Sequence, residues 1–254
     1  AVCLLLISTT TAQTAKTAIQ YYDQGIKLLD TEKYTEALAA FKNAIAKNPG
    51  YKEAFYSAGW TSNELKKYTD AVTYLEKAKT LWPNEAKVYL ELGYANEMLK
   101  KKNIAIDNYN KCLSINDEYA LAYKYLGLLY YDDFNNEKAV ENFEYYLELV
   151  PDTKDDNVYY KKGVAENDLG KYNAALASIK KSVELKPGST RNINELAYTH
   201  YLLENADEAL QHYDKALSID PKSLTALNGR ADVYRKLKKD AAAAIKLYAK
   251  TLEL

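Results

Sequence analysis

Cysteine and histidine, on which most metal sites and many nucleophilic active sites depend, are scarce in this chain. It has two cysteines, Cys3 and Cys112, and two histidines, His200 and His212. A zinc site needs clustered Cys or His ligands, so we predict none. We expect Cys112, without a disulfide partner, to be a small buried residue. We expect one histidine to be packed and the other exposed, rather than a catalytic pair.

Catalytic motifs are missing as well. Acidic residues such as Asp155 and Asp156 fall on a predicted loop, but no Ser/His/Asp arrangement, glycine-rich phosphate loop or metal-ligand spacing accompanies them. The sequence therefore predicts no catalytic residues, no cofactor and no enzymatic activity.

Charge of one sign is not in excess. The chain has 34 basic and 35 acidic residues, a net charge of -1, and its only arginines are Arg191, Arg230 and Arg235. Binding to a nucleic-acid backbone needs a clustered basic surface, and bidentate recognition of phosphate relies on arginine. We therefore expect no nucleic-acid partner.

The first residues, AVCLLLISTTTAQ, form an apolar run followed by small and hydroxylated residues. This order is typical of the core and cleavage region of a signal peptide. We therefore expect residues 1–12 to be a partial signal peptide and the protein to be exported to the periplasm or cell envelope. The alternatives are a membrane anchor whose upstream half is not included, or a frayed apolar tail.

The remainder of the chain is a repeat. Gly25, Gly59, Gly93 and Gly127 are each 34 residues apart, and Gly163 follows after 36. A second set of small residues, each followed four positions later by a large one, recurs with the same spacing: Ala37 and Phe41, Ala71 and Leu75, Ala105 and Tyr109, Ala139 and Phe143, Ala175 and Ile179, Ala209 and Tyr213. Most units close on a proline: Pro49, Pro83, Pro151, Pro187 and Pro221. A period in this range indicates stacked supersecondary units.

Glycine inside a helix costs about 1 kcal/mol relative to alanine, so its repeated use indicates close approach of a neighbouring helix. Each helix alone is short and marginal, and only stacking on its neighbours buries its apolar face. Two junctions depart from the pattern. Unit three has Asp117 where the closing proline is expected, and the stretch Val150 to Asn157 contains two extra residues. The longer junction is either a hinge or a tolerated surface insertion, and we favour the insertion.

These positions resemble the tetratricopeptide repeat, a helix-turn-helix unit with a large residue opening helix A, a glycine four residues later, an alanine and an aromatic in helix B, and a terminal proline. The resemblance implies an all-α, right-handed superhelical solenoid of about seven units. In this register the array covers residues 18–254, with units 18–51, 52–85, 86–119, 120–155, 156–189, 190–223 and 224–254.

The resemblance also implies that the A helices line a concave groove. Partner-binding candidates on these helices are Tyr22, Tyr56, Trp60, Tyr94, Tyr125, Tyr131, Tyr160 and Tyr198, and other groove positions hold Lys87, Glu91, Asn167, Arg191 and Asn194. Tyrosine and tryptophan are enriched at interaction surfaces. We rank Trp60, Tyr94 and Tyr198 first, because tyrosine is common in the repeat's own consensus at positions such as that of Tyr22.

We therefore expect a non-enzymatic scaffold that binds a protein or peptide. Membership of a membrane-associated complex is one form that this binding could take. Repeats that clamp chaperone tails carry lysine and asparagine where this chain has Tyr22, Ile26 and Ser57, so we expect no chaperone-tail clamp. The composition, rich in tyrosine, lysine and asparagine, and the Ala-Gln at the expected cleavage point also resemble exported envelope proteins of the Bacteroidetes. Two alternatives stay open: the recognition arm of a larger enzyme or sensor that continues past Leu254, and a carbohydrate-binding envelope protein.

Overall fold

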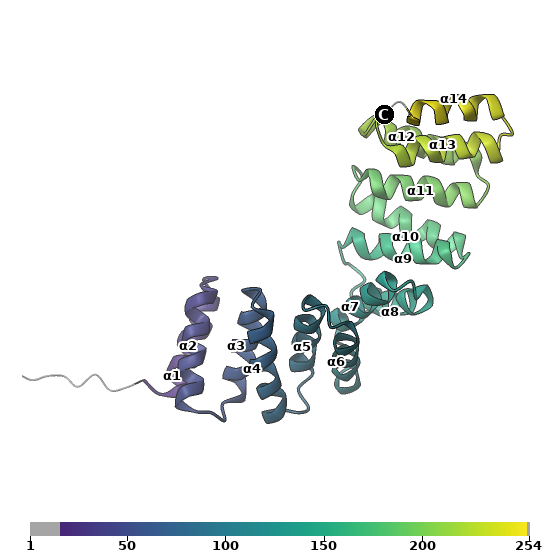
Figure 1. The fold of residues 1–254 in the computed structure, drawn as a ribbon. Helices are drawn as coiled ribbons and strands as arrows, with labels where there is room; N and C mark the ends of the chain where they lie inside the picture. The colour runs from purple at the N-terminus through teal and green to yellow at the C-terminus, as the bar shows by residue number, and fades with distance from the viewer. Residues whose placement is uncertain (1–15, 253–254) are drawn as a thin grey trace, which may run out of the picture. The chain divides into compact units, whose positions relative to one another are not determined.

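The computed structural model describes residues 16–252, which form fourteen α-helices and no strand (Figure 1). They belong to two compact parts, one up to residue 115 and one from residue 116. The first part holds α1 (Ala18–Leu29), α2 (Tyr34–Lys47), α3 (Lys52–Glu64), α4 (Tyr68–Leu81), α5 (Ala86–Met98) and α6 (Lys102–Ile115). The second holds α7 (Ala120–Asp132), α8 (Asn136–Leu149), α9 (Asp156–Asp168), α10 (Tyr172–Leu185), α11 (Thr190–Leu202), α12 (Ala206–Ile219), α13 (Leu224–Lys236) and α14 (Ala241–Leu252).

The helices pack as seven consecutive pairs, each an odd-numbered A helix followed by an even-numbered B helix. Within each part, a B helix also packs on the A helix that follows it. Neighbouring A helices contact one another directly: α3 with α5, α7 with α9, α9 with α11, and α11 with α13. No two B helices in the described residues pack to that extent. In each part the A helices therefore form the inner surface of the stack, and the all-α repeat architecture is confirmed.

The repeated glycines lie where the two helices of a unit meet. A Cβ atom added to Gly25 would lie 2.4 Å from Cε1 of Phe41, and one added to Gly59 would lie 2.4 Å from Cγ of Leu75. The same relation, between a glycine and the large residue sixteen positions later, recurs at Gly93, Gly127 and Gly163. Phe41 and Leu75 are fully buried. The predicted role of glycine in close helix approach is confirmed.

The turn between the helices of each pair contains a residue with positive φ. These residues are Glu32, Lys66, Lys100, Phe134, Gly170, Glu204 and Lys239. In unit two the backbone N–H of Lys66 donates to the carbonyl of Asn63 (2.9 Å), and that of Lys67 donates to the carbonyl of Ser62 (2.8 Å). These bonds satisfy the last carbonyls of α3. Only Gly170 adopts this left-handed conformation without a steric cost.

Cys112 is fully buried in α6, and burial raises the pKa of its thiol to about 12. It is thus the inert packing residue that the sequence predicts.

The lengthened junction at residues 150–157 does not coincide with the division between the two parts, which falls after residue 115. Helices α8 and α9 pack against each other across that junction. Its two extra residues are therefore accommodated inside one compact part, as expected of a surface insertion. The predicted signal peptide at residues 1–12 lies outside the described residues. Within residues 16–252, no helix has the length and apolar character needed to cross a bilayer.

Candidate functional site

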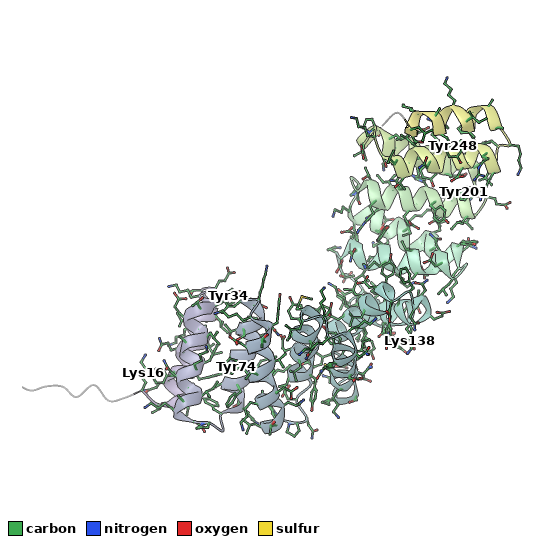
Figure 2. All side chains as sticks on the ribbon, viewed as in Figure 1. Lys16, Tyr34, Tyr74, Lys138, Tyr201 and Tyr248 are labelled. Atoms are coloured by element: carbon green, nitrogen blue, oxygen red, sulfur yellow. The ribbon has the colours of Figure 1, made fainter. Side chains whose placement is uncertain are left out.

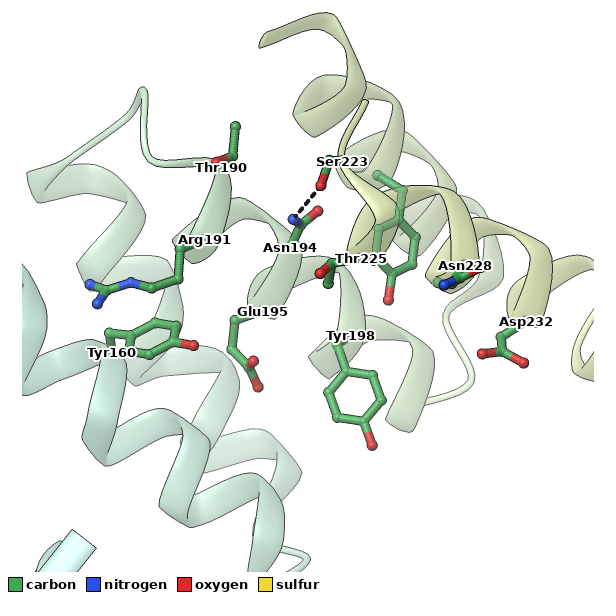
Figure 3. Close-up of a pocket in the computed structure, with 12 residues that line it drawn as sticks. Tyr160, Thr190, Arg191, Asn194, Glu195, Tyr198, Ser223, Thr225, Asn228 and Asp232 are labelled. Carbon is green, nitrogen blue, oxygen red and sulfur yellow. Dashed lines mark hydrogen bonds between the residues drawn. The ribbon is translucent and has the colours of Figure 1, made fainter. Parts of the chain in front are cut away.

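A pocket on the A helices of the second part has a volume of about 630 Å³ and is shown in Figure 3. Helices α9, α11 and α13 supply most of its wall. The lining residues are Tyr160, Thr190, Arg191, Asn194, Glu195, Tyr198, Tyr213, Ser223, Thr225, Asn228, Gly229 and Asp232. The A-helix contacts of α9 with α11 and of α11 with α13 hold these side chains in place.

Glu195 is a partly buried carboxylate on this wall. Its Oε1 accepts a hydrogen bond from Nδ2 of Asn167 (2.8 Å), a residue of the neighbouring helix α9. Burial raises the pKa of Glu195, the Asn167 bond opposes that rise, and the charge of Asp168 adds to it. No ion pair with Glu195 forms within residues 16–252, so this carboxylate has no cationic partner there.

Arg191, the cationic residue nearest to Glu195 in the sequence, already has other partners. The guanidinium of Arg191 lies over the ring of Tyr160, 4.0 Å from its centroid (Figure 3). Nη2 of Arg191 is 3.4 Å from Oδ2 of Asp156, and Nη1 donates to Oδ1 of Asn157 (3.2 Å). Arg191 therefore closes one end of the pocket with its charge already balanced.

Two further acceptors belong to the same pocket. Asn194 is 8% exposed and donates through Nδ2 to Oγ of Ser223 (3.3 Å), while its Oδ1 is buried without a hydrogen-bond partner. Asp232 accepts from Arg235 (2.6 Å) and from the hydroxyl of Tyr248 (2.7 Å). Burial alone would raise the pKa of Asp232, but these two bonds outweigh it and the pKa is lowered. Asp232 therefore stays ionised near neutral pH.

A smaller pocket, with a volume of about 320 Å³, lies on the A helices of the first part. Its lining residues are Tyr22, Ile26, Leu29, Glu53, Tyr56, Ser57, Trp60 and Lys87. Nζ of Lys87 lies over the ring of Tyr56 (4.8 Å to the centroid) and near that of Trp82 (4.7 Å). The pocket thus combines aromatic walls with a cation that is held by ring contacts.

Five of the eight predicted groove residues line these pockets. The first-part pocket contains Tyr22, Tyr56 and Trp60, and the second-part pocket contains Tyr160 and Tyr198. Tyr94, Tyr125 and Tyr131 line neither of the two. Their role in partner binding stays a prediction.

Two of the three residues that we ranked first, Trp60 and Tyr94, also make contacts between units. The ring of Trp60 meets that of Tyr34 edge-on (6.2 Å), and Tyr94 meets Tyr68 in the same way (6.1 Å). Tyr34 and Tyr68 open helices α2 and α4, and Figure 2 shows Tyr34 in place. These half-buried aromatic residues of the A helices therefore also stabilise the stack itself.

Sequence reasoning named Arg191, Asn167 and Asn194 but missed Glu195 and Asp232. A signal for Glu195 was available, because it follows Glu91, a groove position, by 104 residues, as Tyr198 follows Tyr94. A signal for Asp232 was also available, because it follows Tyr198 by one repeat of 34 residues. Its place in the pocket depends on how α13 packs on α11.

The expectation of one packed histidine is confirmed by His200, which is buried, but the expectation of an exposed one is wrong, because His212 is half-buried. The rings of His200 and His212 stack with their centroids 5.3 Å apart, so they form a packed pair. Burial lowers the pKa of both, and the neighbouring Lys180 lowers both further. No cluster of three or more His, Cys, Asp or Glu suited to a metal ion occurs in residues 16–252.

Comparison with known proteins identifies the repeat. Three family models, each described as Tetratricopeptide repeat, match residues 22–86, 86–119, 156–189 and 192–223. Among curated proteins, the chain is 29% identical over 113 residues to Heat shock protein STI1 of Saccharomyces cerevisiae, which covers 44% of this chain and 19% of that protein. It is 33% identical over 108 residues to the Hsp70-Hsp90 organizing protein of Triticum aestivum, covering 42% and 17%. The chain thus matches less than one fifth of either relative.

Solved structures show the same fold. YrrB, described as a TPR protein with an unusual peptide-binding site, has a TM-score of 0.68 at 22% identity, covering 74% of this chain and 96% of YrrB. The C-terminal part of a TPR repeat-containing protein from Cytophaga hutchinsonii also has a TM-score of 0.68, at 20% identity, covering 92% and 95%. The glycine register, the seven helix pairs and these matches together lead to one conclusion. The chain belongs to the tetratricopeptide-repeat family.

Proposed function

We propose that this protein is a non-enzymatic scaffold that binds a polypeptide partner on the A-helix surface. The observation that carries the proposal is that each compact part has a pocket on this surface with both aromatic and polar walls. Aromatic side chains with polar tips provide large contact areas at little entropic cost, and they dominate the energetics of protein interfaces. The family and its solved relatives are consistent with this use.

Chaperones belong among the partners to be tested, because one curated relative is named an Hsp70-Hsp90 organizing protein. The absence of a chaperone-tail clamp stays a prediction from Tyr22, Ile26 and Ser57. Export to the periplasm or cell envelope, and a membrane-associated complex, also stay predictions. Export rests on residues 1–12, which lie outside the described residues.

Site-specific photo-crosslinking in cells tests the proposal. A benzophenone amino acid is placed in the full chain at Trp60 or Tyr198, on the A-helix surface, or at the exposed B-helix positions Lys77 and Lys180 as matched controls. We expect protein adducts from positions 60 and 198 and none from 77 and 180. Adducts from the B-helix positions alone, or from none of the four, would contradict the proposal.

A further inference from the structure

The second-part pocket has two carboxylates in its lining, those of Glu195 and Asp232. Asp232 is already bound by Arg235 and by the hydroxyl of Tyr248, whereas Glu195 has no cationic partner within residues 16–252. Arg191, the only cationic lining residue, is bound to Asp156 and Asn157 and lies over Tyr160. Glu195 is therefore the one charged lining residue without a partner of opposite charge in the described part of the chain, and a ligand group that balances it must carry positive charge.

The Glu195 carboxylate is the group in this pocket that needs a positively charged partner. Its side chain has one hydrogen-bond donor, Asn167, and no cation within residues 16–252. A carboxylate removed from water without a counter-charge is costly, which is the cause of its raised pKa. An incoming ammonium or guanidinium group beside Glu195 supplies the missing counter-charge.

The walls of the pocket suit a cation as well. Tyr160 and Tyr198 present aromatic rings to the pocket (Figure 3), and Tyr198 is 43% exposed, whereas the lining residue Tyr213 is buried in the core. A cation over an aromatic face is attracted by the ring quadrupole, and Arg191 over Tyr160 already shows this geometry in the same pocket.

The first part repeats the arrangement around Glu91. Tyr56, Asn63, Lys87, Glu91 and Tyr94 precede Tyr160, Asn167, Arg191, Glu195 and Tyr198 by 104 residues each. Their contacts correspond: Nδ2 of Asn63 donates to Oε2 of Glu91 (2.8 Å), as Asn167 does to Glu195, and Lys87 lies over Tyr56 as Arg191 lies over Tyr160. Burial raises the pKa of both glutamates. The carboxylate and its surroundings thus occur once in each part.

We propose that the pocket formed by α9, α11 and α13 takes a lysine or arginine side chain of the bound polypeptide, with Glu195 as its counter-ion. Glu91 occupies the corresponding position in the first part. The proposal rests on the polypeptide-binding function above and names the residue class that the pocket selects.

Four synthetic peptides test it, each acetylated and amidated with the sequence Ala-Ser-X-Ser-Ala, where X is lysine, arginine, norleucine or glutamate. They are titrated into the isotope-labelled full chain, and binding is read from amide NMR signals of α9, α11 and α13. We expect the lysine and arginine peptides to bind about tenfold more tightly than the norleucine peptide, and the glutamate peptide most weakly.

Glu195→Gln keeps the acceptor for Asn167 but removes the charge, so it should abolish the preference for lysine over norleucine. Glu184→Gln, which neutralises an exposed carboxylate of α10, is the control and should leave the preference intact. Equal binding of the norleucine and lysine peptides, or an unchanged preference in Glu195→Gln, would overturn the inference while leaving polypeptide binding itself standing. Failure of all four peptides to bind would also overturn it, and the crosslinking experiment then judges the proposed function separately.

Discussion

The contact between Gly59 and Leu75 shows how single residues determine this stack. A side chain at position 59 would meet Leu75, which is fully buried. Gly59→Leu gains about 1 kcal/mol in helix propensity, but overpacking a tight contact typically costs 1–3 kcal/mol or more. We expect a net loss of about 1–2 kcal/mol in the free energy of unfolding, measured in urea. Gly188→Leu, at a turn with no atom within 4 Å of the added Cβ, is the control and should have little effect. Equal stability of wild type and Gly59→Leu would contradict the role of this glycine.

The turn residues with positive φ lead to a second prediction. Lys66 adopts φ 58° and Gly170 adopts φ 73° at equivalent turns. A left-handed conformation costs a residue with a Cβ atom about 1 kcal/mol, and glycine avoids that cost. Lys66→Gly should therefore raise the free energy of unfolding by about 0.5–1 kcal/mol, and Gly170→Ala should lower it by about 1 kcal/mol. Changes of the same sign in both variants would disprove the argument.

Much of the residue-level account could be predicted. The glycine register places Tyr56, Trp60, Tyr160 and Tyr198 on the A helices, and all four line pockets there. The sequence could not show that the Glu195 carboxylate lacks a counter-charge, because that depends on where Arg191 points. Arg191 lies in the same helix, one turn away, yet it turns toward Tyr160 and Asp156.

At the scale of helices, the bond from Asn63 to Glu91 joins α3 to α5 and makes stability depend on pH. Burial raises the pKa of Glu91 from 4.5 to about 7, so the folded state holds a proton that the unfolded state has released between these values. Stability should therefore fall as pH rises from about 4.5 to 7. Glu91→Gln removes this loss, and we expect it to be about 1–3 kcal/mol more stable than wild type at pH 8 and similar to it below pH 4.5.

Urea unfolding of both proteins at the two pH values measures this difference. Glu76→Gln, which neutralises an exposed carboxylate of α4, is the control and should show little pH-dependent difference from wild type. A Glu91→Gln protein that is less stable than wild type at pH 8 would contradict the account of Glu91 as an uncompensated charge.

The histidine pair shows why helix contacts within the repeat were harder to predict than the helices themselves. His200 and His212 belong to α11 and α12, and their separation of twelve residues gave no sign that the rings stack. The helices could be predicted because glycine, alanine and proline recur at set positions. Which polar side chains meet depends on rotamers, which the repeat pattern does not specify.

At the scale of the whole molecule, seven helix pairs follow from the period of the sequence, but the division into two compact parts does not. The two extra residues at 150–157 made the junction between α8 and α9 a candidate hinge in the sequence. The division between the two parts falls elsewhere, after residue 115. The junction at the division, between α6 and α7, has the usual length of the repeat. It differs from the other junctions by having Asp117 in place of the closing proline. Insertion length was a poor guide, because a surface turn absorbs extra residues at little cost.

The central claim is that the A-helix surface binds the partner, and a titration of the partner identified by crosslinking tests it most directly. Replacing Trp60 and Tyr94 together by alanine should weaken binding by about 2 kcal/mol or more, roughly thirtyfold, because buried aromatics carry much of an interface's energy. Thermal unfolding is measured alongside, since both rings also pack on neighbouring tyrosines. Tyr145→Ala, which removes an exposed aromatic from the B helix α8, should leave affinity unchanged. Unchanged affinity in a folded Trp60→Ala/Tyr94→Ala protein, or a loss only in Tyr145→Ala, would contradict the claim.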